Sequence, residues 1–218
     1  MKDKLNFCTI LNITSFARGL ALYESLQKHL ANAHLFVLAL DQATDDLLTK
    51  LNLVNLTIIS LDKFESNESS LTPQTKTDKE YNWAAIPAFI FYTLNNHEIS
   101  SCTYLDHTLY FFNFPYSLTR VLEQSSVTLI AYNANAKISK TVGVLDKYST
   151  QFITFKKDNP GLVALKWWNE HYNQHNLNDL AQQFNKHVAI LDYPTNAINP
   201  TTIKKYTVFF DNRIYAYN

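Results

Sequence analysis

The chain has 218 residues, of which 46% are hydrophobic and 14% aromatic, which is enough for a single domain over residues 1–218 with a sizeable core. Its formal net charge is zero, so bulk charge directs it neither to nucleic acid nor to an anionic membrane surface. The run from Ala84 to Leu94 is too short to cross a bilayer, and residues 1–15 lack the features of a signal peptide. We therefore expect a cytoplasmic protein without a transmembrane segment, in which Cys8 and Cys102 are buried free thiols.

The first part of the chain alternates strands and helices. Short apolar runs predict strands, and apolar residues at helical spacing predict helices. In chain order these are a strand at Leu5 to Leu11, a helix at Ser15 to Ala31 with Ser15 as its N-cap, a strand at His34 to Leu40, a helix at Gln42 to Leu51 and a strand at Leu56 to Ser60. This alternation predicts a doubly wound, mostly parallel sheet.

The second part has a more mixed pattern. Glu65 to Asp78 is polar and rich in Ser and Thr, so we expect a mobile loop there. The elements expected after it are a helix at Lys79 to His97 interrupted by Pro87, strands at Cys102 to Asp106, Val127 to Ala131 and Gln151 to Phe155, helices at Gly161 to His175 and Asn178 to Lys186, and strands at Val188 to Leu191, Tyr206 to Phe210 and Ile214 to Tyr217.

Asp106 ends the fourth expected strand, inside the aromatic stretch from Ser101 to Pro115. In doubly wound sheets the ligand lies outside the carboxyl ends of the strands, so this is a functional position. The turn after the first strand has no G-x-G-x-x-G, and the chain has only three glycines, which argues against a glycine-cradled phosphate. A metal held by acidic residues is the usual substitute. Asp106 could instead cap the turn that follows it.

Four blocks support a resemblance to a known family. They read F-C-T-I-L-N-I-T-S-F-A-R-G, Y-L-D-H-T-L-Y-F-F, Q-F-I-T-F-K-K-D-N-P-G and N-A-I-N, in this order. The chain resembles bacterial sugar-nucleotide glycosyltransferases of the GT-A fold, distantly similar to the retaining group called family eight. That resemblance implies a Rossmann-like, mostly parallel central sheet flanked by helices, with a mixed C-terminal part. It also implies transfer of a sugar from a nucleotide-diphosphate donor.

The resemblance implies a D-x-D motif that holds a divalent cation, commonly manganese, against the diphosphate. Here the motif is degenerate, because Asp106 is kept as the metal ligand and Thr108 stands at the second acidic position. Ser149 replaces an Asn that would meet the sugar, and Asp179 survives in a segment whose following Gln is Leu180. We expect a Mn²⁺ or Mg²⁺ requirement that is weak or absent.

The expected site residues each have an alternative. Asp179 is the expected catalytic residue, and the expected nucleotide-sugar-binding residues are Thr9, Leu11, Arg18, Trp83, Asp106, Thr108 and Ser149. Arg18 could equally pair with a surface carboxylate, Trp83 could equally be packing, and Asp179 could equally complement a helix dipole. Thr108 is more simply a turn residue.

For some other residues a structural role is a better interpretation than a functional one. Asp41 is expected to cap a helix rather than to bind ribose. Trp167 and Trp168 face different sides of a helix, so at least one belongs to the core. His171 and His175 lie four residues apart, but the sequence offers no third zinc ligand, so we expect solvent-facing histidines rather than a zinc site.

Two functions remain open from the sequence. The first is a glycosyltransferase that uses a nucleotide-diphosphate sugar and an unknown acceptor, and that builds a bacterial surface glycan or modifies a small acceptor. The second is a catalytically degenerate relative that binds a nucleotide sugar or a partner.

Overall fold

The computed structural model describes residues 5–30, 32–67, 78–111, 121, 124–131, 147–171, 177–192 and 209–211. The strands are β1 (Leu5–Leu11), β2 (Ala33–Ala39), β3 (Leu56–Ser60), β4 (Ser101–Leu105), β5 (Leu109–Phe111), β6 (Val127–Ala131), β7 (Tyr148–Lys156), β8 (Val188–Asp192) and β9 (Phe209–Asp211). The helices are α1 (Phe16–His29), α2 (Gln42–Leu51), α3 (Leu61–Asn67), α4 (Asp78–Asn96), α6 (Asn159–His171) and α7 (Leu177–Gln183).

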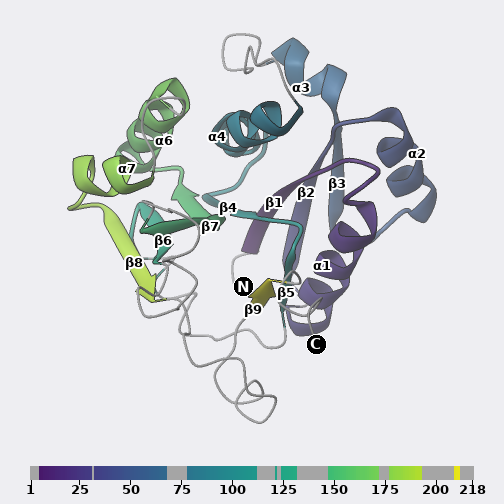
Figure 1. Ribbon diagram of the computed structural model, residues 1–218, viewed down its shortest axis with the longest axis horizontal. Helices are drawn as coiled ribbons and strands as arrows, with labels where there is room; N and C mark the ends of the chain where they lie inside the picture. Colours follow the sequence, from purple (N-terminus) through teal and green to yellow (C-terminus); the bar gives the residue numbers. More distant parts are fainter. Residues whose placement is uncertain are drawn as a thin grey trace.

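Seven strands form one sheet in the order β3-β2-β1-β4-β7-β6-β8 (Figure 1). Neighbouring strands are parallel except where β7 pairs with β4 and with β6. The chain winds outward from β1 to β3 and then returns to the other side of β1 as β4, so the winding direction reverses between β1 and β4. The predicted mostly parallel α/β sheet with a mixed C-terminal part is confirmed.

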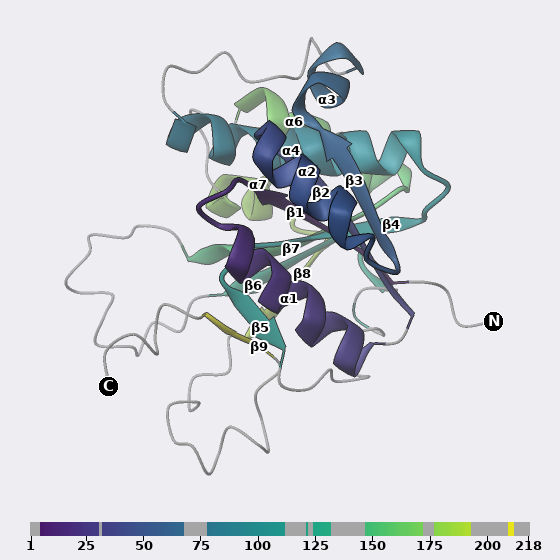
Figure 2. The same ribbon diagram turned by 90° about the vertical axis from the view of Figure 1, so that its right-hand side faces the viewer.

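Helices cover both faces of the sheet and enclose two cores (Figure 2). Helices α3, α4, α6 and α7 pack on one face, and α1 and α2 pack on the other. Successive side chains of a strand point to opposite faces. In β1, Cys8 and Ile10 therefore join the α4 core, while Phe7 and Leu11 join the α1 core. The two cysteines are buried free thiols, as predicted.

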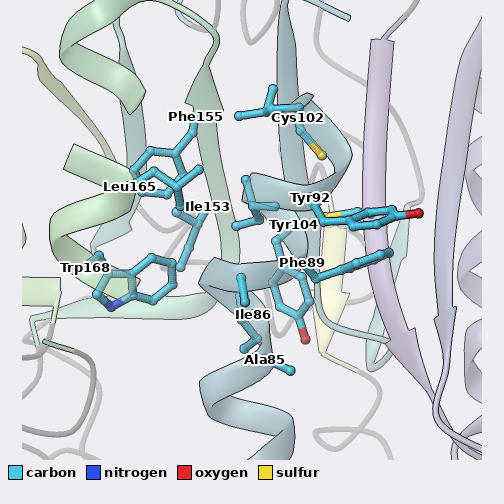
Figure 3. Packing of buried hydrophobic residues seen from close by; sticks show 14 of the residues in the cluster. Ala85, Ile86, Phe89, Tyr92, Cys102, Tyr104, Ile153, Phe155, Leu165 and Trp168 are labelled. Carbon is cyan, nitrogen blue, oxygen red and sulfur yellow. The ribbon is translucent and has the colours of Figure 1, made fainter. Parts of the chain in front are cut away.

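Helix α4 is the centre of the larger core. Its Phe89 and Tyr92 are buried and lie beside Tyr104 of β4 (Figure 3). The sequence predicts an interruption at Pro87, but the helix is continuous through that residue. Proline removes one helical hydrogen bond. The buried side chains before and after Pro87 keep the helix on the sheet despite that loss.

Helix α3 is absent from the prediction, which places a polar loop from Glu65 onward. Its Phe64 is fully buried and meets the rings of Phe89 and Tyr92 edge-on, with centroid distances of 5.9 and 5.7 Å. One buried aromatic ring therefore outweighs the polar composition of the segment. The rest of the predicted loop, residues 68–77, lies outside the described residues.

A small ribbon of β5 and β9 lies on the α1 side of the sheet. Leu109 and Phe111 of β5 are buried in the α1 core, and the Phe111 amide donates to the Ser25 hydroxyl of α1 at 3.1 Å. Strand β9 overlaps one predicted C-terminal strand, whereas the predicted strand at Ile214 to Tyr217 lies outside the described residues. Within the described part of the chain, no helix has the length and apolarity needed to span a bilayer.

Gly161, in the first turn of α6, lies against the backbone of two other segments. Its amide donates to Asp158 Oδ1 at 2.8 Å, and Asp158 Oδ2 accepts from the Ser126 hydroxyl at 3.0 Å. A methyl group on Gly161 would overlap the Lys156 carbonyl oxygen and lie 3.1 Å from the Ser126 carbonyl oxygen. Backbone atoms of paired strands cannot move aside easily, so this position requires glycine.

We predict that Gly161→Ala lowers the free energy of unfolding by about 1–3 kcal/mol, the usual cost of overpacking. Gly19→Ala is the matched control, because the added methyl would meet only the flexible side chain of Leu11. Alanine is also the better helix former by about 1 kcal/mol, which offsets part of that crowding. Urea denaturation of both variants measures the difference. An equal or larger loss in Gly19→Ala would contradict the explanation.

His97 follows α4 and packs between aromatic rings. Its ring centroid lies 4.5 Å from that of Phe36 and 6.4 Å from that of Tyr92. Its Nε2 atom is buried without a hydrogen-bond partner among the described residues. Burial, and secondarily the charge of Lys63, lowers the pKa of His97 below its usual value.

The lowered pKa of His97 predicts a loss of stability on mild acidification. The unfolded chain binds this proton more readily, so the contribution is complete above the usual value of 6.5 and is lost as the pH falls towards the folded value. Denaturation at pH 7.5 and at pH 5.5 should show a smaller loss for His97→Asn than for the native chain. The other histidines are the same in both proteins, so the comparison isolates His97. Equal losses would show that His97 is not responsible.

Candidate functional site

The carboxyl ends of β1, β2, β3 and β4 meet at one edge of the sheet, and β7 begins there because it runs the opposite way. Two turns flank the point where the winding reverses. One is residues 12–15 after β1, and the other is residues 106–108 after β4. In doubly wound sheets this crevice is the ligand site. The sequence correctly placed Asp106 at the carboxyl end of the fourth strand, β4.

The turn after β1 is closed by its own polar side chains. The Asn12 side-chain oxygen accepts from the Ser15 amide at 3.0 Å and from the Thr14 hydroxyl at 2.8 Å. The Asn12 amide donates to Ser15 Oγ at 2.9 Å. Ser15 stands at the N-cap position of α1, but its side chain makes no capping bond. The predicted capping bond is wrong because the hydroxyl is bonded back to Asn12 instead.

Asp41 ties this turn to the next strand. Its Oδ1 accepts from the Thr44 amide at 2.8 Å and caps α2, as predicted. Its Oδ2 accepts from the Ile13 amide at 2.8 Å. Burial alone would raise the pKa of Asp41, but the bonds from Ile13 and Thr44 lower it below its usual value. One carboxylate thus holds the ends of β1 and β2 together.

Asp106 forms the turn after β4. Its Oδ1 accepts from the amide and the hydroxyl of Thr108, and its own amide donates to the Gln151 carbonyl oxygen of β7 at 2.8 Å. The turn-capping role is therefore present. The other carboxylate oxygen, Oδ2, has no hydrogen bond or ion pair with any described residue, and Asp106 is partly exposed. Asp106 can both hold its turn and offer one oxygen to a ligand.

Ser149 and Gln151, on β7, continue the polar contacts from Thr108. The Gln151 side-chain amide donates to Thr108 Oγ1 at 3.4 Å, and the Ser149 hydroxyl donates to Gln151 Oε1 at 3.3 Å. Three predicted site residues, Asp106, Thr108 and Ser149, are thus joined through a fourth that the sequence interpretation missed. A glutamine in an apolar strand is the signal that could have found it, since a buried amide needs partners.

The side chains of Thr9 and Leu11 do not reach this edge. Both are buried on the α1 side of β1, and Leu11 packs against Gly19. Thr9 Oγ1 has no hydrogen-bond partner among the described residues. Arg18 lies exposed on α1 and forms no hydrogen bond or ion pair with a described residue, so the pairing with a carboxylate considered from the sequence is not seen.

Two further predicted residues lie on elements that begin at the same edge. Trp83, near the start of α4, is 55% exposed. Asp179 is in the first turn of α7, and its neighbour Asn178 accepts from the Lys147 amide at 2.9 Å, just before β7. That bond brings the start of α7 to the start of β7. Because more than half of its surface is exposed, the Trp83 ring is available to a ligand, unlike a core ring.

The tandem tryptophans are both engaged by other rings. Trp168 is buried and stacks on Phe155 with a centroid distance of 5.9 Å, which confirms that one of the pair belongs to the core. Trp167 stacks on His171 at 4.8 Å, and His171 Nδ1 lies 2.8 Å from the Trp167 carbonyl oxygen. His175 lies outside the described residues.

The described residues do not fit a closed divalent-cation site. Hard cations bind several oxygen ligands, usually with more than one carboxylate. Here Asp106 Oδ1 already accepts two hydrogen bonds, and the proton of the Thr108 hydroxyl is directed at Asp106. No group of three His, Cys, Asp or Glu side chains that could hold a metal occurs in the described ranges. One carboxylate oxygen remains for a cation.

No family model matches the chain. The uncharacterized protein YfnF of Bacillus subtilis is 29% identical to it over an alignment of 171 residues, with a coverage of 75% of this chain and 56% of that protein. The chain spans about half the length of the curated relatives it matches.

Solved glycosyltransferase structures have a similar fold. Mouse xyloside xylosyltransferase 1 in its apo form has a TM-score of 0.55 at 9% identity, covering 86% of this chain and 85% of that one. The apo form of the glycosyltransferase GlyE from Streptococcus pneumoniae TIGR4 has a TM-score of 0.51 at 11% identity, covering 87% of this chain and 45% of that one. At such identities the likeness shows the fold alone. The chain has the α/β fold of GT-A-like glycosyltransferases.

The double role of Asp41 predicts separable effects of two substitutions. Asp41→Asn keeps an oxygen for the Thr44 amide but turns an NH₂ group towards the Ile13 amide. We expect a loss of about 1 kcal/mol, and a loss of about 2 kcal/mol for Asp41→Ala, which removes the cap as well. Hydrogen exchange should quicken at Ile13 and stay slow at Thr44 in the Asn variant.

Acid titration provides the control for Asp41. Because the folded pKa is lowered, the stabilisation is complete above the usual value of 3.8 and is lost as the pH falls through the folded value. The Asn variant should lose less stability over that range than the native chain. Slow exchange at Ile13 in Asp41→Asn would show that this tie does not hold the turn.

Proposed function

We propose that this protein is a glycosyltransferase that binds a nucleotide-diphosphate sugar at the carboxyl edge of the sheet and transfers the sugar to an acceptor. The observation that carries the proposal is Asp106, a carboxylate at the reversal point of the sheet with one oxygen left for a ligand. The shared fold with glycosyltransferases supports it. The sequence resemblance to family eight supports the choice of donor.

The exposed groups around this edge suit the parts of such a donor. Arg18 is exposed where α1 begins and forms no ion pair with a described residue, and we assign it to the diphosphate. The exposed ring of Trp83 offers a stacking surface to the base or the sugar. Asp179 is assigned to the donor sugar as the candidate catalytic residue. For Thr9 and Leu11 the proposal is limited to backbone contact, since their side chains are buried.

A carboxylate beside a diphosphate repels it unless a cation or a hydrogen-bond donor lies between them. A bound Mn²⁺ or Mg²⁺ would neutralise the diphosphate leaving group. With a single oxygen available, we propose that Asp106 binds such a cation weakly. We propose that it otherwise accepts a hydrogen bond from a hydroxyl group of the donor. Donor binding should therefore depend little on added metal.

The direction of the Thr108 hydroxyl favours a second function. Because its proton is donated to Asp106, it adds no charge to a cation site, which suits a relative that binds nucleotide sugars without transferring them. Release of nucleotide diphosphate from a panel of UDP- and GDP-sugars separates the two functions. Turnover supports the transferase, while binding without turnover supports the binding protein. For the transferase, we propose a bacterial surface glycan as product; the relative from Bacillus subtilis supports only the bacterial part of this proposal.

The nucleotide assignment predicts a thermal shift. UDP or GDP should stabilise the protein by about 2.7 kcal/mol at a hundredfold excess over the dissociation constant. Asp106→Ala should remove most of this shift, and Mn²⁺ should change it little. Glu98→Ala is the matched control, because Glu98 is an exposed carboxylate just before β4, at the other end of that strand. No shift with millimolar nucleotide, or an equal loss in Glu98→Ala, would contradict the assignment.

A further inference from the structure

A chain of polar side chains leads from the start of β7 to the carboxylate of Asp106. Ser149 Oγ accepts from the backbone amide of Gln151 at 3.1 Å and donates to the side-chain oxygen Oε1 of Gln151 at 3.3 Å. Gln151 Nε2 donates to Thr108 Oγ1 at 3.4 Å, and Thr108 Oγ1 donates to Asp106 Oδ1. The turn after β4 and the first residues of β7 are thus connected through the side chain of Gln151.

The direction of these bonds follows from the chemistry of the last acceptor. An ionised carboxylate can only accept, so the Thr108 proton points to Asp106. The Thr108 oxygen is then left as an acceptor, which requires the NH₂ end of Gln151 to face it. The oxygen end of Gln151 consequently faces the Ser149 hydroxyl. Every member of the chain has one orientation, and all of them are set by Asp106.

The three residues of this chain are buried. Ser149, Gln151 and Thr108 are 1%, 6% and 4% exposed. Water has little access to these groups, so a missing partner would leave a buried polar atom unsatisfied. In low-dielectric surroundings each hydrogen bond also polarises the next one. Removing the side-chain amide of Gln151 would therefore let the Thr108 hydroxyl rotate, which would weaken the hydrogen bond from Thr108 to Asp106.

We propose that Gln151 is a positioning residue that acts through Thr108 to hold Asp106 in one rotamer, with Oδ2 left open to the ligand. The part of this inference that concerns the ligand rests on the proposed function. The effect of Gln151 on the rotamer of Asp106 does not depend on the proposed function. The two parts are therefore tested by separate measurements on the same variants.

The first measurement needs no ligand. Side-chain rotamers of Asp106 are read by NMR from three-bond couplings to its carboxyl carbon, in the native protein and in Gln151→Met, which keeps the length of the side chain but not its donor. We expect one rotamer in the native protein and averaging in the variant. Thr108→Val must give the same averaging, because it removes the hydroxyl that links Gln151 to Asp106 and leaves only the backbone amide of residue 108 as a donor to Oδ1. If Gln151→Met fails to fold, Thr108→Val alone tests the proposal. A single rotamer retained in either variant overturns the proposal.

The second measurement uses UDP and GDP as probes in titration calorimetry. Gln151→Met should weaken binding roughly tenfold, the size of coupling seen between residues of one network. In the Thr108→Val background the same substitution should have no further effect on affinity, because the proposed influence of Gln151 on Asp106 passes through the Thr108 hydroxyl. Independent, additive losses overturn the proposal. If the native protein binds neither nucleotide while Gln151→Met still averages the rotamer, the proposed function fails and the positioning role stands.

Thr154→Val is the matched control for both measurements. Thr154 is on β7 like Gln151, is 2% exposed, and its hydroxyl lies 2.8 Å from that of Thr103 on β4. The substitution therefore removes a buried hydroxyl bond between the same two strands without touching Asp106. It should lower the melting temperature and leave both the rotamer and the nucleotide affinity unchanged. A change of either readout in Thr154→Val would attribute the effects to general destabilisation and overturn the proposal.

Discussion

The antiparallel pairing of β7 with β4 is the constraint on which the candidate site depends. The Asp106 amide donates to the Gln151 carbonyl oxygen at 2.8 Å, one step beyond the last pair of the ladder, Leu105 with Phe152. Because β7 runs against its neighbours, it begins where β4 ends. Its first residues, rather than those at its end, therefore lie beside Asp106. A parallel β7 would have placed Ser149 and Gln151 at the opposite edge of the sheet.

The turn after β1, on the other side of the reversal point, is held by a different set of hydrogen bonds. There the Asn12–Ser15 turn is closed by its own side chains, and Asp41 ties it to the start of α2. Both turns are therefore built before any ligand arrives, which lowers the entropic cost of binding. Two carboxylates share this design. Asp41 uses both oxygens for backbone amides, whereas Asp106 uses one and leaves the other available.

Strand and helix positions in the first half were predictable because their apolar residues follow a clear period. The position of Asp106 at the reversal point followed from strand order alone. Helix α3 was not predictable, since its hold on the core depends on the single ring of Phe64 meeting α4. The bonding of Ser15 back to Asn12 was also hidden, because a serine before a helix predicts a cap whichever partner it takes.

The role of Gln151 could not be read from the sequence for a related reason. Its partners, Thr108 and Asp106, are more than forty residues away in the chain, and only the antiparallel register brings them together. Strand alternation likewise predicts two faces for β1, but not which face carries a ligand. The structure puts Thr9 and Leu11 on the α1 core face. Sequence periodicity therefore locates the edge of the sheet, while pairing decides which side chains are present at it.

The central claim is that a nucleotide diphosphate binds at the edge where β1 and β4 end. The most direct measurement is a map of backbone amide chemical shifts during titration with UDP or GDP. The account predicts that the largest changes occur at residues 12–15, at 106–109 and at the first residues of β7, with α2 and the amino ends of the strands unchanged. Changes concentrated at the amino ends of the strands, or no changes at millimolar nucleotide, would contradict it.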